Sequence, residues 1–160
     1  MKIQIIGRRE IEKMSRETPF SEKTAIICIT DYENDFVKFK YKPDFCLQLR
    51  FDDVDNDVII DEAGISPTEG QIVQIQKKYH MFTDDHAKEI ASFYFSVCEE
   101  ANVIICQCEH GQSRSAAIAA AIMEFKGRKG IVVFADDKYY PNKVVFRKTL
   151  KALYELSEKK

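Results

Sequence analysis

A cysteine and an arginine are separated by five residues in the segment Cys108-Glu109-His110-Gly111-Gln112-Ser113-Arg114-Ser115. A cysteine thiolate is a nucleophile, and an arginine guanidinium can donate two parallel N–H bonds to one oxyanion. An apolar run precedes the segment and an alanine-rich run follows it, so we expect Cys108 to end a strand and Arg114 to begin a helix. Loop amides at a helix N-terminus bind anions. The segment therefore predicts a sulfur nucleophile beside a bound tetrahedral anion such as phosphate.

The remaining residues of this loop suit the same chemistry. Gly111 can adopt a positive φ, which lets a short loop wrap around an anion. Ser115 can donate a hydrogen bond to the sulfur of Cys108 and so help it to leave when a phosphoenzyme is hydrolysed. We expect phosphate to be held by Arg114 together with the loop residues Glu109, His110, Gly111, Gln112 and Ser113.

Strand and helix patterns alternate along the chain and would position this loop. Short apolar or alternating runs predict strands at 2–6, 24–30, 45–51 and 103–107. Caps and helical periodicity predict helices at 9–17, 66–79, 83–100, 113–125 and 141–155. Residues 52–64 are expected to form an acidic loop. Asn142 is expected to cap the last helix, and a contact with the site is its alternative role. The pattern predicts an α/β fold, a mostly parallel central sheet of about four strands flanked by helices, with ligands bound beyond the carboxyl ends of the strands.

The segment from Cys108 to Ser115, between its strand and its alanine-rich helix, resembles the phosphate-binding signature of the protein tyrosine and dual-specificity phosphatase superfamily. That signature consists of a cysteine, five residues, an arginine and then serine or threonine. The resemblance extends over about residues 24–125. It extends more weakly to the helix that begins at Pro141-Asn142. Within it, the stretch from Leu49-Arg50-Phe51-Asp52-Asp53 through the helix after Asp85 to the loop is similar to short bacterial and phage members of the superfamily.

The resemblance implies a two-step mechanism. Cys108 would form a thiophosphate intermediate, and water would then release inorganic phosphate while an aspartate transfers the protons. The match at the end of the third strand makes Asp53 the expected acid and Asp52 the second candidate. Asp84 and Asp85 stay as alternatives because the family usually places its acid closer to the cysteine, although both also suit a helix N-terminus.

The function expected from these residues is a cysteine-dependent phosphomonoesterase of the protein tyrosine or dual-specificity type. Its substrate would be a phosphorylated protein or a small phosphomonoester. The alternative is a catalytically weak pseudophosphatase that recognises a phosphorylated partner. Sulfur transfer is a third class, but its loops commonly hold one residue fewer. Family members commonly have histidine where this chain has Gln107, and we therefore hypothesise a thiolate that is less strongly favoured than usual.

Two motifs that suggest metal binding do not meet the requirements of a metal site. Cys106, Cys108 and His110 alternate, but zinc sites need four ligands and no second pair exists. Asp53, Asp55 and Asp57 resemble the start of a calcium loop, but the glycine and glutamate required later in that loop are missing. We expect no metal and no cofactor, and we expect Cys28, Cys46, Cys98 and Cys106 to be core residues.

Composition narrows the possible partners. The 160 residues carry a net charge of −2 with a pI near 6.0 and show no basic cluster, so we expect no nucleic-acid partner. The longest apolar run, 116–123, is far shorter than a membrane span, and no signal peptide is recognised at the N-terminus. The odd count of five cysteines favours reduced thiols and a cytoplasmic location. We expect a single domain over residues 1–160.

Overall fold

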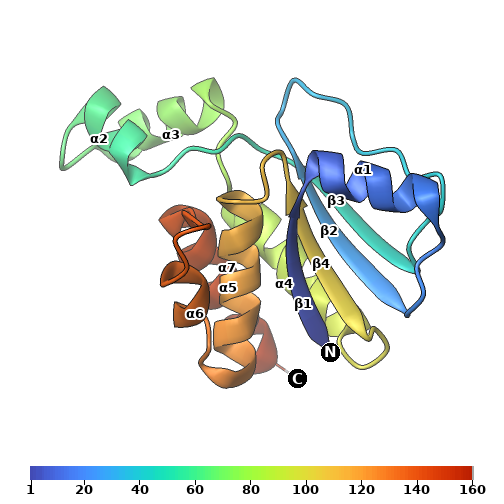
Figure 1. The fold of residues 1–160 in the computed structure, drawn as a ribbon. Coiled ribbons are helices and arrows are strands. Elements are labelled where there is room, and N and C mark those ends of the chain that lie inside the picture. The colour runs from blue at the N-terminus through green and yellow to red at the C-terminus, as the bar shows by residue number, and fades with distance from the viewer. Residues whose placement is uncertain (160) are drawn as a thin grey trace.

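Four parallel strands form the central sheet of the computed structural model, which describes residues 1–159 (Figure 1). The strands lie in the order β1-β4-β2-β3. All pairings are parallel, which confirms the expected α/β fold class. The two inner strands are buried at every residue, as their continuous apolar sequences predict. The bounds are β1 Lys2–Gly7, β2 Thr24–Thr30, β3 Phe45–Arg50 and β4 Val103–Cys108.

Helices cover both faces of the sheet (Figure 1). On one face, α1 (Arg8–Glu17) packs through Ile11 against Ile26 and Ile105. The larger core lies on the other face, where three helices pack against alternate residues of the same strands. The central helix there is buried on most sides because its sequence is rich in alanine and isoleucine. These three helices are α4 (Asp84–Val97), α5 (Arg114–Gly127) and α7 (Lys143–Ser157).

A pair of helices projects from the sheet between β3 and α4 (Figure 1). The first, α2 (Asn56–Ala63), replaces the acidic loop expected there, so that prediction is wrong. Asp55 explains the difference, since its side chain accepts hydrogen bonds from two backbone amides of the first turn. The second, α3 (Glu69–Lys78), begins later than predicted. Its cap is Thr68, which forms a capping box with Gln71, rather than Ser66.

The last part of the chain also departs from the sequence prediction in detail. Gly127 is the last residue of α5, two residues beyond the predicted end, and Arg128 caps the helix in the left-handed conformation with φ +54°. A four-residue helix, α6 (Ile131–Phe134), was not predicted. Asn142 caps α7 as expected. No helix among residues 1–159 combines the length and apolar composition that crossing a membrane requires.

Candidate active site

The sheet brings Cys108 and Arg114 to opposite ends of one short loop. Cys108 is the last residue of β4 and Arg114 is the first of α5. Both are almost completely buried, and the Sγ atom of Cys108 lies 3.1 Å from the Oγ atom of Ser115. A hydroxyl at this distance can donate to a thiolate. The expected arrangement of a strand, a loop and a helix N-terminus around the sulfur is therefore present.

Gly111 allows the loop to fold back against β1. Its φ is +70°, a conformation that side-chain-bearing residues rarely adopt. A Cβ atom at this position would lie 2.5 Å from the backbone N of Gly7 and 2.5 Å from the carbonyl C of Ile6. The loop is also hydrogen-bonded to the start of α1, where the backbone amide of Arg8 donates to the carbonyl of Glu109 at 3.0 Å. Glycine is the residue type that satisfies both the angle and the close approach.

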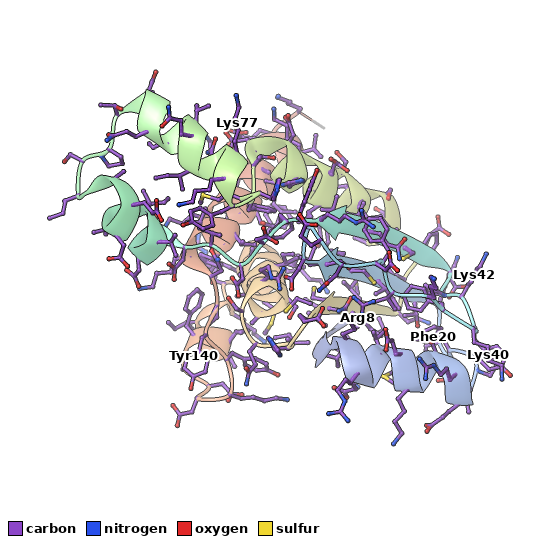
Figure 2. All side chains as sticks on the ribbon, turned by 90° about the horizontal axis from the view of Figure 1, so that it is seen from above. Arg8, Phe20, Lys40, Lys42, Lys77 and Tyr140 are labelled. Atoms are coloured by element: carbon purple, nitrogen blue, oxygen red, sulfur yellow. The ribbon has the colours of Figure 1, made fainter. Side chains whose placement is uncertain are left out.

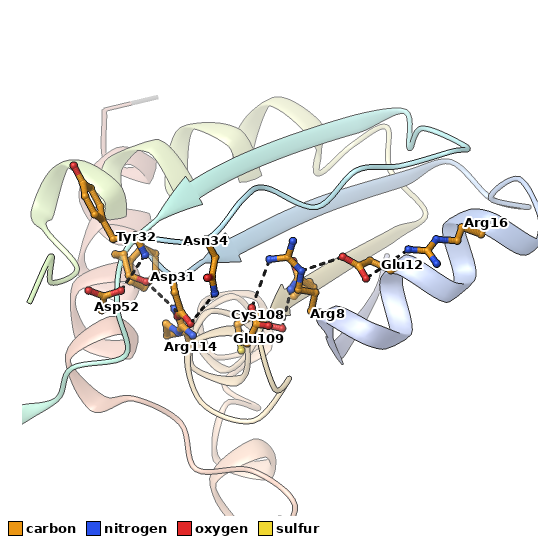
Figure 3. A network of polar contacts seen from close by, with 12 residues as sticks. Arg8, Glu12, Arg16, Asp31, Tyr32, Asn34, Asp52, Cys108, Glu109 and Arg114 are labelled. Carbon is orange, nitrogen blue, oxygen red and sulfur yellow. Dashed lines mark hydrogen bonds and ion pairs between the residues drawn. The ribbon is translucent and has the colours of Figure 1, made fainter.

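The guanidinium of Arg114 is held on one side by two oxygens. Its Nη1 atom donates to the carbonyl of Phe51 at 2.7 Å and lies 2.5 Å from Oδ1 of Asp31 (Figure 3). Its Nε atom is buried and has no hydrogen-bond partner among the described residues. An unpaired buried donor is costly, and Nε is part of the planar fork with which arginine binds an oxyanion. The arrangement therefore leaves a donor for an anion while fixing the plane of the side chain.

Two further side chains support the loop from outside. Nη1 of Arg8, in α1, lies 3.7 Å from Oε2 of Glu109, so the only carboxylate in the loop is paired with a cation (Figure 3). Gln107 is buried in β4, and its Nε2 atom donates to the carbonyl of Cys108 at 2.7 Å. Gln107 thus hydrogen-bonds the backbone beside the sulfur.

Asp53 is hydrogen-bonded to the loop between Cys108 and Arg114, although 60 residues separate it from Ser113. Its Oδ1 atom accepts from Oγ of Ser113 at 2.9 Å and from Nδ2 of Asn142 at 2.9 Å. Asn142 also donates to the carbonyl of Val54 at 3.0 Å, and its own Oδ1 accepts two amide bonds from α7. Both hydrogen bonds to Asp53 therefore engage one carboxylate oxygen, Oδ1, rather than Oδ2.

The other candidate acids lie in different surroundings. Asp52 accepts a hydrogen bond from the amide of Tyr32 at 3.0 Å through its Oδ1 atom (Figure 3). Asp84 lies 2.6 Å from Nζ of Lys148, and this hydrogen bond holds the pKa of the carboxyl below its usual value. Asp85 pairs with Lys88 along the same helix. Of the four candidates, Asp53 is the one with a hydrogen bond to the loop.

The remaining cysteines have free thiols. Cys106 is fully buried, and this burial raises the pKa of its thiol, in agreement with a core role. Cys28 is also fully buried, with a thiol pKa raised by its hydrogen bond with Cys46 and by burial. Cys46 is exposed at the edge strand β3, so the prediction of a core position was wrong for this residue. Cys98 is half-buried.

Sequence reasoning missed one contributor to the site, Asp31, and ranked the contact of another, Asn142, below a role as a helix cap. Asp31, at the end of β2, meets Arg114 because β2 lies beside β4 in the sheet. For Asn142 the sequence favours a helix cap over a contact with the site, and the structure has both, since Asn142 caps α7 and also donates to Asp53. An acidic residue directly after a buried strand was the available signal for Asp31, since carboxyl ends of neighbouring parallel strands meet at one edge. No local signal identified Asp53 as the partner of Asn142.

Comparison with known proteins gives matches only at the level of structure. No protein-family model matches the sequence, and no curated protein matches it. The structure is similar to PTPMT1 in complex with PI(5)P, with a TM-score of 0.56, 13% identity, and coverage of 99% of this chain and 94% of that chain. It is similar to human DUSP28, with a TM-score of 0.53, 12% identity, and coverage of 99% and 95%.

A third similar structure is Tk-PTP in the active form, with a TM-score of 0.50, 16% identity, and coverage of 97% of this chain and 92% of that chain. The alignments span nearly the whole of this chain and of each compared structure, so the similarity includes the sheet and the helices on both faces. At these identities the likeness concerns the backbone arrangement. The chain has the fold of the protein tyrosine and dual-specificity phosphatase superfamily.

Proposed function

We propose that this chain is a cysteine-dependent phosphomonoesterase of the protein tyrosine or dual-specificity type. The observation that carries the proposal is the 3.1 Å contact between Sγ of Cys108 and Oγ of Ser115 at the start of a helix that also presents buried Arg114. A thiolate, a hydroxyl that can stabilise it and a guanidinium are thereby joined in one loop. Loop amides leading into a helix N-terminus complete an anion site.

Phosphate would bind in this loop with two of its oxygens on Arg114. The unpartnered Nε atom supports this orientation, since Nη1 is already engaged by Phe51 and Asp31. The backbone amides from Glu109 to Ser113 would hold the remaining oxygens. Charge-assisted and bidentate bonds of this kind fix both the position and the rotation of the phosphate.

In the first step the thiolate of Cys108 attacks phosphorus, a sulfur–phosphorus bond forms, and the bond to the ester oxygen breaks. The electron pair of that bond remains on the leaving oxygen, which takes a proton from Asp53. The geometry of Asp53 suits this role because both of its hydrogen bonds engage Oδ1. Oδ2 would carry the proton that is transferred.

In the second step a water molecule attacks phosphorus and displaces the sulfur of Cys108. Asp53, now a carboxylate, accepts the proton of the water, and inorganic phosphate is released. The electron pair of the broken sulfur–phosphorus bond returns to sulfur as a thiolate. The nearby hydroxyl of Ser115 stabilises that thiolate by a hydrogen bond and so speeds this step.

The loop favours a substrate that carries a single phosphate. It contains no lysine that could meet additional phosphates, and its one carboxylate, Glu109, is turned toward Arg8. We infer a phosphorylated protein or a small phosphomonoester as the substrate, in the cytoplasm. PTPMT1 is solved in complex with PI(5)P, whereas the loop of this chain, which has no lysine, is expected to favour a substrate with a single phosphate.

Hydrolysis of para-nitrophenyl phosphate by the wild type and by Cys108→Ser tests this proposal. Turnover without added metal, abolished in Cys108→Ser and inhibited by vanadate, is the expected result. Tight binding of phosphate or vanadate without turnover would instead assign the loop to recognition of a phosphorylated partner. Because Cys108→Ser replaces one atom, its melting temperature should match that of the wild type and serves as the folding control.

A further inference from the structure

The outer edge of β1 is an open strand edge. β1 is the terminal strand of the sheet and pairs only with β4 among the described strands. The amide of Lys2 donates to the carbonyl of Asn102, which places Lys2 in the ladder with β4. The N–H and C=O of one residue point to the same side of a strand, and successive residues alternate. The N–H and C=O groups of Ile3 and Ile5 therefore point to the open side. Such an edge is a template for another strand.

A groove of about 490 Å³ runs along this edge. Residues of β1 form its floor, Glu10 and Met14 of α1 line one side, and the α5 and α6 region lines the other. Viewed from above, α1 and the α6 segment that precedes Tyr140 lie on opposite sides of the sheet edge (Figure 2). Val132 of α6, which lines the groove, is 58% exposed, and the adjacent Ile131 is 68% exposed. A strand that entered this groove would bury apolar side chains as well as gain backbone bonds.

The charges along the groove differ from one end to the other. At the start of β1, Lys2 is exposed, and Lys129 lines a smaller adjoining pocket with Met1 and Ile3. At the other end, Glu10 and Asp136 line the groove, each with an exposed side chain. The basic end and the acidic end are thus on the same edge, about one strand length apart.

We propose that this edge binds a second copy of the chain, with the two β1 strands antiparallel about a two-fold axis at Gln4. In that register Ile3 of each copy lies opposite Ile5 of the other. The outward-pointing N–H and C=O groups of these two residues then hydrogen-bond to each other. The two sheets become one continuous sheet. The axis is perpendicular to the sheet, so each helix layer meets the same layer of the other copy. An isologous contact of this kind is the commonest form of homodimer.

Charge complementarity favours a second copy in this orientation. On the α1 face, Lys2 of one copy meets Glu10 of the other, because both lie at the same height when the strands run antiparallel. On the opposite face, Lys129 meets Asp136. A parallel arrangement would bring like charges together, and like charges across an interface are unfavourable. The edge is therefore complementary to itself only in the antiparallel sense.

Sedimentation of the full chain over micromolar to millimolar concentration measures the dimer directly. The wild type is expected to dimerise, and Ile5→Pro is expected to be monomeric, because proline removes an outward donor and leaves the ladder to β4 intact. A thermal melt of Ile5→Pro identifies any loss of fold.

Charge exchange gives the second measurement, which does not depend on proline. Lys2→Glu and Glu10→Lys should each weaken the dimer several-fold, and the double variant should restore it, since the pairing is reversed but kept. A wild type that stays monomeric throughout would overturn the proposal. So would a dimer insensitive to all three variants, or a monomer that binds a peptide along the same edge in place of a second copy.

Discussion

The guanidinium of Arg114 is oriented by one neutral and one charged oxygen, both from residues outside the loop that joins Cys108 to Arg114. Phe51 supplies a carbonyl and Asp31 a carboxylate, both on Nη1. This side chain is 4% exposed and could not be buried with its charge unpaired. The contacts therefore satisfy one nitrogen of the guanidinium and set the plane in which the others meet an anion.

Arg114→Lys should lower kcat/KM and weaken vanadate binding. Lysine keeps the charge but lacks the planar fork, so it replaces a bidentate contact by a single ammonium. We expect a loss of roughly 10²–10³-fold in kcat, the range seen when one donor to a developing oxyanion is removed. Steady-state kinetics and vanadate titration check this, and equal rates for the two proteins would show that the guanidinium does not bind the phosphate.

Asp53→Asn should lower kcat by about 10²–10⁴-fold on an ester with a poor leaving group, the range for loss of a general acid. The effect should be smaller for para-nitrophenyl phosphate, whose leaving group needs less protonation. Asparagine keeps an oxygen for Ser113 and Asn142, so the loop contacts are preserved.

Asp52→Asn is the matched control for that experiment. Asp52 holds the backbone of Tyr32 rather than the loop, and its amide replacement keeps an acceptor for that bond. Its kcat should stay close to that of the wild type. If Asp52→Asn were the slower enzyme of the two, the acid would be Asp52 and not Asp53.

The packing of the loop against β1 depends on the backbone conformation of Gly111. Gly111→Ala forces a side chain into φ +70° and places Cβ 2.5 Å from Gly7. The left-handed conformation alone costs about 1–2 kcal/mol, and the close approach must also displace β1 or the loop. We expect lower stability and loss of phosphate binding, measured by urea unfolding and by titration.

Gly70→Ala, in α3, is the comparison for that variant. A Cβ atom at Gly70 would meet nothing within 4 Å. Alanine in a helix is more favourable than glycine by roughly 0.5–1 kcal/mol, so this variant should unfold at slightly higher urea. If the two variants were equally stable, the conformation of Gly111 would not be what holds the loop against β1.

For the whole molecule, stability should fall as the pH drops below the usual range of histidine, in part because of His86. Burial lowers the pKa of His86, and its Nδ1 atom accepts the amide of Thr83 at the start of α4. A group with a lowered histidine pKa contributes stability that is complete above the unfolded pKa, near 6.5, and is lost as the pH falls toward and through the folded pKa. Protonation also removes the acceptor for Thr83.

His86→Gln separates this contribution from others. Glutamine suits the same position of a capping box and does not titrate in this range. Unfolding free energy measured from pH 7 down to about pH 5 should fall less steeply in the variant than in the wild type. Parallel curves for the two proteins would mean that His86 is not a source of the pH dependence.

The sequence predicted the sheet well because its inner strands are determined locally. β2 matches the predicted bounds, and β4 ends one residue later, at Cys108. Continuous β-branched runs buried on both faces have few alternatives. α2 was missed for the opposite reason: it is only eight residues long, none of them is fully buried, and its cap Asp55 stands among several acids.

The candidate site was predictable where its parts are adjacent in sequence. Cys108, Gly111 and Arg114 lie in one loop, and the resemblance placed Asp53 beside it. The contacts of Asp31 and Asn142 depend on which strands and helices become neighbours, and local sequence does not encode that choice. The exposed position of Cys46 likewise follows from β3 lying at the sheet edge.

The central claim is that Cys108 becomes covalently phosphorylated, and mass spectrometry of an acid-quenched reaction tests it most directly. Ser115→Ala should slow release of the sulfur and let the intermediate accumulate, because the hydroxyl 3.1 Å from Sγ is removed. We predict a mass increase of one phosphoryl group, located on the peptide that contains Cys108 and absent in Cys108→Ser with Ser115→Ala. Turnover with no adduct on Cys108, or an adduct on another residue, would contradict the mechanism.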